Sequence, residues 1–163
     1  QKILRDVILK TVAAFMNTDG GTLLIGVKDP KENEEGIIEP VILGIEPEYQ
    51  LLKENKRNRE GYVESILGIF KSGFDKNQQS LTSSNMKVKM IRVDEELQGS
   101  WQGVHGNTIC RIDVEPVPKD HWSNAVYVNT SKKEGVLYVR SADNSEPLVG
   151  MKAQQYVMSN FKS

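Results

Sequence analysis

An apolar helical pattern that runs directly into a glycine turn is the feature that most constrains the fold of this chain. Apolar residues at helical spacing predict a helix over residues 2–17. They are Leu4, Ile8, Val12, Phe15 and Met16. Asp19-Gly20-Gly21 should end that helix, since glycine readily adopts the left-handed conformation that closes a helix. The almost wholly apolar run 22–27 follows at once and predicts a strand buried on both faces, with Leu24 and Val27 inaccessible to solvent.

The rest of the hydrophobic pattern interleaves helices and strands at first and becomes mainly β later. Strands are expected at 41–45, 87–93, 108–115, 125–129 and 136–140, the last two as a hairpin. Helices are expected within 47–73 and over 149–161, and polar loops at 29–39 and 75–85. The predicted fold class is therefore α/β with α+β character: a mixed β-sheet with packed helices, in a single domain that covers residues 1–163.

Composition excludes several classes of protein. The net charge is −1, so the chain has no global basic field of the kind that marks many nucleic-acid binders. With two histidines and one cysteine it lacks the ligands of a classical zinc site. A lone cysteine, Cys110, excludes an internal disulfide and predicts a reducing, cytoplasmic location. Apolar runs are too short for a membrane helix, so no membrane partner is expected. Because Gln1 already lies inside a helical pattern, we expect the chain to be N-terminally cut from a longer protein.

Three segments of the chain share a pattern with one known family. The first is KTVAAFMNTDGGTLLIGVKD at 10–29, the second combines VEPVP at 114–118 with AVYV at 125–128, and the third is YVRSADNSEPL at 138–148. In this order they resemble the helix, glycine turn, strands and closing segment of the Schlafen-type, AlbA-like domain family. Two residues depart from that family's pattern: Ala142 replaces a usual glycine, and Glu146 stands where arginine is common.

The resemblance implies an association with nucleic acid, and it also raises a catalytic alternative. In Schlafen-type ribonucleases an aspartate at the position that resembles Asp29 joins two upstream glutamates to hold a divalent metal. The segment that carries those glutamates is absent here, so Asp29 is the one remaining candidate metal ligand. We therefore expect no cofactor and no RNA cleavage from this chain alone, with Mg²⁺ or Mn²⁺ as the cofactor of a longer protein. A phosphate-binding P-loop is excluded, because the order here is helix, glycine turn, strand.

The candidate nucleic-acid contacts are basic and small polar residues. Arg140, at the end of an edge-like strand, is the strongest single candidate, although an internal salt bridge would explain it equally well. The others are Ser141 and Ser145 beside it, Lys132 and Lys133 in the hairpin loop, the basic run Lys53, Lys56, Arg57 and Arg59, and Asn17 and Thr18 at the glycine turn. Basic runs are usually only solvated surface. A helix stop would be enough to explain the glycine turn, but exposed Asn17 and Thr18 side chains beside two glycines could also approach a phosphate or sugar. Trp101 and Trp122 are expected to close the edge of a core more often than to stack on a base.

Three hypotheses for function remain open at this point. The first is a nucleic-acid-associated module, binding RNA or DNA, within a larger regulatory or defence protein. The second is part of a metal-dependent endoribonuclease whose other carboxylates lie upstream. The third is a protein-interaction or oligomerisation module that forms a homodimer.

Overall fold

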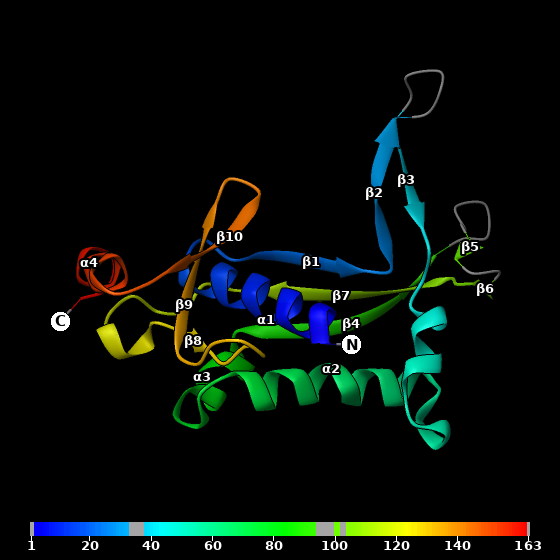
Figure 1. Cartoon of the computed structure of the whole chain (residues 1–163), viewed down its shortest axis with the longest axis horizontal. Helices are drawn as coiled ribbons and strands as arrows, with labels where there is room; N and C mark the ends of the chain where they lie inside the picture. The colour runs from blue at the N-terminus through cyan, green and yellow to red at the C-terminus, as the bar shows by residue number, and fades with distance from the viewer. Residues whose placement is uncertain (1, 33–37, 94–99, 102–103, 163) are drawn as a thin grey trace. The chain divides into compact units, whose positions relative to one another are not determined.

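The computed structural model describes residues 2–32, 38–93, 100–101 and 104–162 (Figure 1). Its residues form two compact units. Unit 1 comprises Gln1–Leu23, Ile66–Lys87 and Asp113–Ser163, and unit 2 comprises Leu24–Ser65 and Val88–Ile112. Each unit is described by itself below. The expectation of a single domain over 1–163 stays a prediction.

Helices and strands are interleaved along the chain, which confirms the predicted α/β class. The helices are α1 (Lys2–Asn17), α2 (Arg59–Gly73), α3 (Gln79–Ser84) and α4 (Met151–Asn160), and the 3-10 turns are η1 (Glu46–Leu51), η2 (Glu54–Lys56), η3 (Lys76–Gln78) and η5 (Trp122–Asn124). The strands are β1 (Gly21–Ile25), β2 (Val27–Glu32), β3 (Ile38–Ile42), β4 (Met86–Arg92), β5 (Ser100–Trp101), β6 (Val104–His105), β7 (Thr108–Val114), β8 (Tyr127–Val128), β9 (Val136–Ser141) and β10 (Asn144–Leu148). They pair in the orders β1-β7-β4, β10-β9-β8, β2-β3 and β5-β6.

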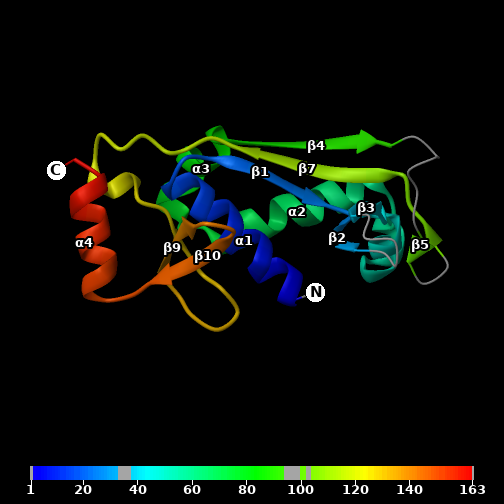
Figure 2. The same ribbon diagram turned by 90° about the horizontal axis from the view of Figure 1, so that it is seen from above.

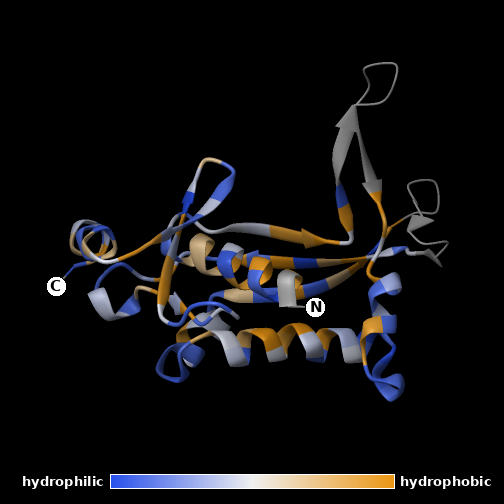
Figure 3. Cartoon of the chain, viewed as in Figure 1, coloured by the Kyte–Doolittle hydropathy of each residue, from blue (hydrophilic) through white to orange (hydrophobic). Residues whose placement is uncertain are grey.

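Helix α1 supplies much of the core of unit 1. It packs against the β10-β9-β8 sheet, and two views place it beside β9 (Figures 1 and 2). Its buried residues face the interior together with buried residues in or next to α2, β8 and β9. The α1 residues are Ile8, Leu9, Val12 and Met16, and the others are Phe70, Phe74, Val126, Val128 and Leu137. Hydropathy colouring shows apolar segments along α1 and β9, and a hydrophilic loop between β8 and β9 (Figure 3). The apolar spacing that predicted the helix is therefore its core-facing stripe.

The end of α1 lies at the predicted glycine turn. The Gly20 N–H donates to the Phe15 carbonyl at 2.9 Å, and Gly20 adopts a φ of +77°. A Cβ at this position would lie 2.6 Å from the Val114 carbonyl oxygen, so only glycine fits. The Thr18 hydroxyl donates to the Ala14 carbonyl at 2.6 Å and is thus engaged inside the helix end.

Asn17 is completely buried, so the expectation of an exposed side chain there is wrong. Its amide nitrogen donates to the carbonyls of Val126 and Tyr138, each at 2.9 Å, and its amide oxygen accepts from the Val126 N–H at 2.8 Å. The Tyr156 hydroxyl donates to the Asn17 carbonyl at 2.7 Å. Asn17 therefore ties the end of α1 to the strand region of unit 1, and its side chain is not accessible to a ligand.

The apolar run 22–27, whose last four residues belong to unit 2, is not the continuous buried strand that its composition predicts. Strand β1 ends at Ile25, and Gly26, with a φ of +94°, separates it from β2. Leu24 is 47% exposed and Val27 is half-buried, so the expectation of full burial is wrong for both. An apolar run alone does not tell a strand covered on both faces from one that leaves a face open.

Strand β7 lies within the strand expected at 108–115. Cys110 and Ile112, which share one face of it, are both fully buried. The predicted hairpin is also present, because β8 and β9 pair antiparallel. Helix α4 covers most of the helix expected over 149–161.

Two segments expected to be polar loops are structured instead. Residues 27–32 and 38–42 form the antiparallel pair β2-β3, while 33–37 lie outside the described residues. Residues 76–84 form η3 and α3, where the Asp75 carboxylate accepts from the Asn77 N–H at 2.8 Å. The polar composition of these segments did not indicate the β2-β3 pair or the η3–α3 segment, because a solvated hairpin and a short capped helix need few apolar residues.

No helix in the described part of the chain is both long and apolar enough to cross a membrane.

Leu9 in α1 and Leu24 in β1 differ in their exposure to solvent. Leu9 is fully buried and Leu24 is 47% exposed. Leu9→Ala should therefore lower the free energy of unfolding by about 2–5 kcal/mol. Leu24→Ala should cost only about 1 kcal/mol, since half of that side chain already meets water. Urea unfolding of both variants measures the difference, and equal losses would contradict the burial described here.

The β9–β10 hairpin has a strained turn. Ser141 pairs with Asn144, which leaves Ala142 and Asp143 as the turn, and Ala142 has a φ of +51°. Ala142→Gly should raise the free energy of unfolding by about 0.5–1 kcal/mol, because glycine adopts a positive φ without steric cost. The matched control is Ala153→Gly inside α4, which should lower it by about 1 kcal/mol. Urea unfolding checks both, and a destabilised Ala142→Gly protein would rule out the strain.

Candidate functional site

Positive charge is concentrated in unit 1. Unit 1 has 12 Lys and Arg residues against nine Asp and Glu, a net charge of +3. Unit 2 has nine Lys and Arg residues against 13 Asp and Glu residues, a net charge of −4. The overall charge of −1 therefore conceals a basic unit and an acidic one.

Four basic residues of unit 1 lie on α1, on β9 and in the loop that precedes β9. We call them the basic seam: Lys10, Lys132, Lys133 and Arg140. The Lys10 ammonium lies 5.7 Å from the centre of the Tyr138 ring, and the Arg140 guanidinium lies 5.1 Å from the centre of the Phe15 ring. Both distances suit a cation–π contact, which orients a cation without neutralising it.

Arg140 is held by an aromatic ring and a hydroxyl. Its Nη1 donates to the Ser145 Oγ at 3.3 Å, across the β9–β10 pair. Within the described residues no carboxylate forms an ion pair with Arg140, so the alternative of an internal salt bridge finds no support there. The expectation of an edge-like strand is wrong, since β9 is central in its sheet. Ser141, next to Arg140, is exposed.

Glu146 does not oppose this arginine. It pairs with Val139, whereas Ser145 pairs with Arg140. Successive side chains of a strand point to opposite faces, so Glu146 and Arg140 project from different faces of the β9–β10 pair. The departure from the family pattern at Glu146 therefore does not place a carboxylate against the arginine.

Lys132 and Lys133 are carried by a loop that is hydrogen-bonded to itself. We call residues 129–135 the dilysine loop. The Thr130 hydroxyl oxygen accepts from the N–H groups of Lys132 and Lys133 at 3.4 and 3.1 Å. The Thr130 N–H donates to the Lys133 carbonyl at 2.8 Å, and the Gly135 N–H donates to the Asn129 side-chain oxygen at 2.9 Å. Both lysine side chains are exposed.

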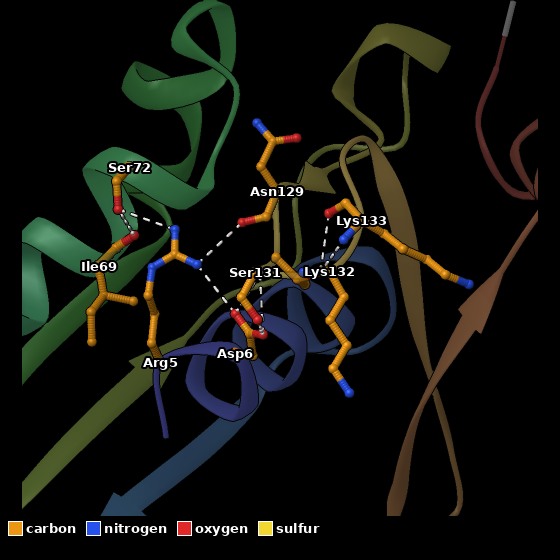
Figure 4. A network of polar contacts seen from close by, with 9 residues as sticks. Arg5, Asp6, Ile69, Ser72, Asn129, Ser131, Lys132 and Lys133 are labelled. Carbon is orange, nitrogen blue, oxygen red and sulfur yellow. Dashed lines mark hydrogen bonds and ion pairs between the residues drawn. The ribbon is translucent and has the colours of Figure 1, made fainter. Parts of the chain in front are cut away.

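Asp6 of α1 fastens this loop to the helix (Figure 4). The Ser131 N–H donates to the two oxygens of its carboxylate at 3.0 and 3.2 Å, and the Ser131 hydroxyl also donates to it. The neighbouring Arg5 contacts Asp6 at 3.2 Å and donates to the Asn129 carbonyl at 3.4 Å. Burial alone would raise the pKa of Asp6, but the Ser131 hydrogen bonds and the charges of Arg5 and Lys10 lower it overall.

The basic run of unit 2 is partly engaged in local contacts. Lys56 forms an ion pair with Glu64, and the Arg57 Nε donates to the Leu52 carbonyl at 3.3 Å. Lys53 and Arg59 are exposed. Because this run and the basic seam belong to different units, their convergence on one surface stays a prediction.

The candidate metal ligand lies outside the described side chains. Strand β2 includes Asp29, but the placement of its side chain is not described. Among the side chains that are described, no three of His, Cys, Asp or Glu come together in a way that would hold a metal ion.

The buried titratable groups of unit 2 have a structural explanation. The Tyr62 hydroxyl donates to the Glu48 carboxylate at 2.8 Å. Burial, and then the nearby charge of Glu48, raise the pKa of Cys110 to about 12. Cys110 is therefore a neutral, unreactive thiol at physiological pH.

Trp122 is 58% exposed, so the expectation that it closes a core edge is wrong. Its ring lies 5.3 Å from that of His121, centre to centre, in η5. An exposed indole of this kind can stack on a base. The side chain of Trp101 lies outside the described residues.

The family model described as Schlafen, AlbA_2 matches residues 1–149. The chain belongs to the Schlafen AlbA_2 family. No curated protein matches the chain.

Sequence reasoning missed the residues that organise the basic seam of this Schlafen AlbA_2 chain. Asp6 and Lys10 are four residues apart in a helix and so share a face, which was a usable signal. The sequence Thr130-Ser131 before two lysines is typical of a hydroxyl-stabilised turn, and this was a second usable signal. No sequence signal pairs Asp6 with Ser131, which lies 125 residues away.

Asp6 should make stability depend on pH in the acidic range. Its pKa is lower in the folded protein than in the unfolded chain, so its carboxylate stabilises the fold fully above the ordinary value. That contribution is lost as the pH falls below about 4 and through the lowered pKa. Asp6→Asn should therefore be destabilised at pH 7, with the deficit shrinking towards pH 3. Urea unfolding across this range tests it, with Asp143→Asn on the exposed hairpin turn as control. A deficit that stays constant with pH would contradict the assignment.

Proposed function

We propose that this domain binds nucleic acid through the basic seam of unit 1. The observation that carries the proposal is a set of contacts: aromatic rings hold the Lys10 and Arg140 side chains, and Asp6 holds the loop that carries Lys132 and Lys133. These contacts orient positive charge without pairing it to carboxylates in the described residues. Orientation of this kind lowers the cost of ordering long side chains on a phosphate backbone. Family membership is consistent with this function.

The length of the seam suits a few phosphates. From Asp6, beside the dilysine loop, to Phe15, beside Arg140, α1 rises about 13.5 Å. A nucleic-acid strand carries one phosphate about every 3.4 Å along a B-form duplex axis. Three or four phosphate contacts are therefore the natural number, which corresponds to weak, salt-sensitive binding without base readout.

The ribonuclease alternative depends on Asp29 and on carboxylates beyond Gln1. No contact of the described residues favours it over binding, so it stays a prediction, as does a requirement for Mg²⁺ or Mn²⁺.

A titration with labelled single- and double-stranded RNA and DNA, followed by fluorescence anisotropy, tests the proposal. Between about 50 and 200 mM salt the affinity should fall with a log–log slope of about −0.7 to −0.9 per phosphate contact. The double variant Lys132→Glu/Lys133→Glu should reduce that slope by about one to two units. Arg140→Ala should weaken binding further, because a guanidinium can grip a phosphate with two hydrogen bonds.

The matched control changes the same amount of charge elsewhere in unit 1. Lys71→Glu/Lys76→Glu should leave the slope nearly unchanged, since both exposed residues lie outside the basic seam and are not candidate contacts. Equal effects of the two double variants would show that only total charge matters and would overturn the proposal. Undetectable binding at low salt would do the same. Sedimentation of the free chain would then test the homodimer alternative.

A further inference from the structure

The dilysine loop contacts α1 through the carboxylate of Asp6, a negative charge that is unexpected beside a cluster of basic residues. Asp6 is 8% exposed and lies beside a cluster that we propose to bind a polyanion. A negative charge there should repel phosphate and weaken binding. Its contacts give it a different role, because its carboxylate oxygens accept from the backbone and side chain of Ser131.

Ser131 is the residue immediately before the two lysines, so its position sets theirs. Inside the dilysine loop, Thr130 holds the backbones of Lys132 and Lys133. Those bonds give the loop its shape but do not attach it to anything else. The Asp6–Ser131 bonds attach this turn to α1, and the Arg5 bond to the Asn129 carbonyl attaches its first residue.

Arg5 extends the attachment to α2. Its Nη2 donates to the Ser72 Oγ at 3.2 Å, while its Nη1 contacts Asp6 (Figure 4). The loop is thus fixed to α1 and to the part of α2 that belongs to unit 1, through adjacent residues of one helical turn. Lys132 and Lys133 are left exposed at the outer end of a fixed backbone.

We propose that Asp6 is a positioning residue for nucleic-acid binding: it fixes the dilysine loop to α1 through Ser131, so that Lys132 and Lys133 are presented in line with Lys10 and Arg140. This inference rests on the proposed function. It makes Asp6 an acidic residue whose removal weakens the binding of a polyanion.

The sign of the effect separates positioning from simple electrostatics. Replacing Asp6 by an uncharged residue removes a negative charge, so electrostatics alone predicts tighter binding in Asp6→Ala and Asp6→Asn. Positioning predicts the opposite. Asp6→Ala should bind about three- to tenfold more weakly, because the released loop must be ordered on binding. Asp6→Asn should lose less, since its amide oxygen still accepts from Ser131.

Two further variants separate loss of the Asp6–Ser131 contact from loss of a negative charge. Ser131→Ala removes the hydroxyl donor without changing any charge and should weaken binding in the same direction, by less than Asp6→Ala. Glu134→Gln removes an exposed negative charge from the same loop, and it should leave affinity unchanged or raise it slightly. Affinities are compared for the four variants and the parent chain by anisotropy with the same oligonucleotide, after far-UV circular dichroism shows that each is folded.

A second measurement does not use nucleic acid. Trypsin cleaves after lysine, so a released loop should be cut faster after Lys132 and Lys133 in Asp6→Ala than in the parent, and at the parent rate in Glu134→Gln. Weaker binding together with faster cleavage at these lysines supports the inference. Binding that tightens in Asp6→Ala, or cleavage that stays at the parent rate, overturns it.

Failure of this inference can be told from failure of the proposed function. If Lys132→Glu/Lys133→Glu abolishes salt-dependent binding while Asp6→Ala does not weaken it, the seam binds nucleic acid but Asp6 does not position the loop. If neither variant changes binding, the proposed function itself fails.

Discussion

The side-chain amide of Asn17 is the contact on which the arrangement of unit 1 depends. It bonds to the backbone N–H and carbonyl of Val126 and to the carbonyl of Tyr138, at the end of α1 where helical hydrogen bonds run out. A buried amide makes such bonds only in one orientation, whereas apolar packing permits small slips. Asn17 therefore sets the register of α1 against the β8–β9 region. The apolar residues around it supply most of the driving force for burial.

That register is what brings the polar residues of α1 to their partners. Asp6, Lys10 and Asn17 are separated by four and seven residues, spacings that keep them on one face of the helix. Along this face a carboxylate meets the dilysine loop, an ammonium meets an aromatic ring, and an amide meets backbone groups. A helix that slipped by one residue would rotate all three away together. The proposed binding surface thus depends on the register in which α1 packs against its neighbours.

Local features of the sequence predicted well, and features set by distant segments did not. The Gly20 turn, strand β7 and the β8–β9 hairpin follow from conformational preferences and periodicity, which are local. Leu24 looked buried because its neighbours are apolar, but exposure depends on what covers the strand. Asn17 looked like a surface turn residue, because its partners lie 109 and 121 residues away and cannot be read from the sequence. The candidate site divides in the same way: the lysines and Arg140 are visible as charges, whereas Asp6 and Ser131 acquire meaning only when folding joins them.

The long separations around α1 also bear on how the chain is made. Helix α1 is synthesised well before the strands that cover it: Tyr138, whose carbonyl accepts from the Asn17 amide, is added 121 residues after Asn17. At a synthesis rate of about 5–20 residues per second, α1 must wait several seconds before its partners exist. During that interval the face that ends in Val12 and Met16 has nothing from β8 or β9 to cover it. Helix α1 consequently keeps an uncovered apolar face during that interval, and its packing is completed only when Val126 and Tyr138, 109 and 121 residues after Asn17, have been added.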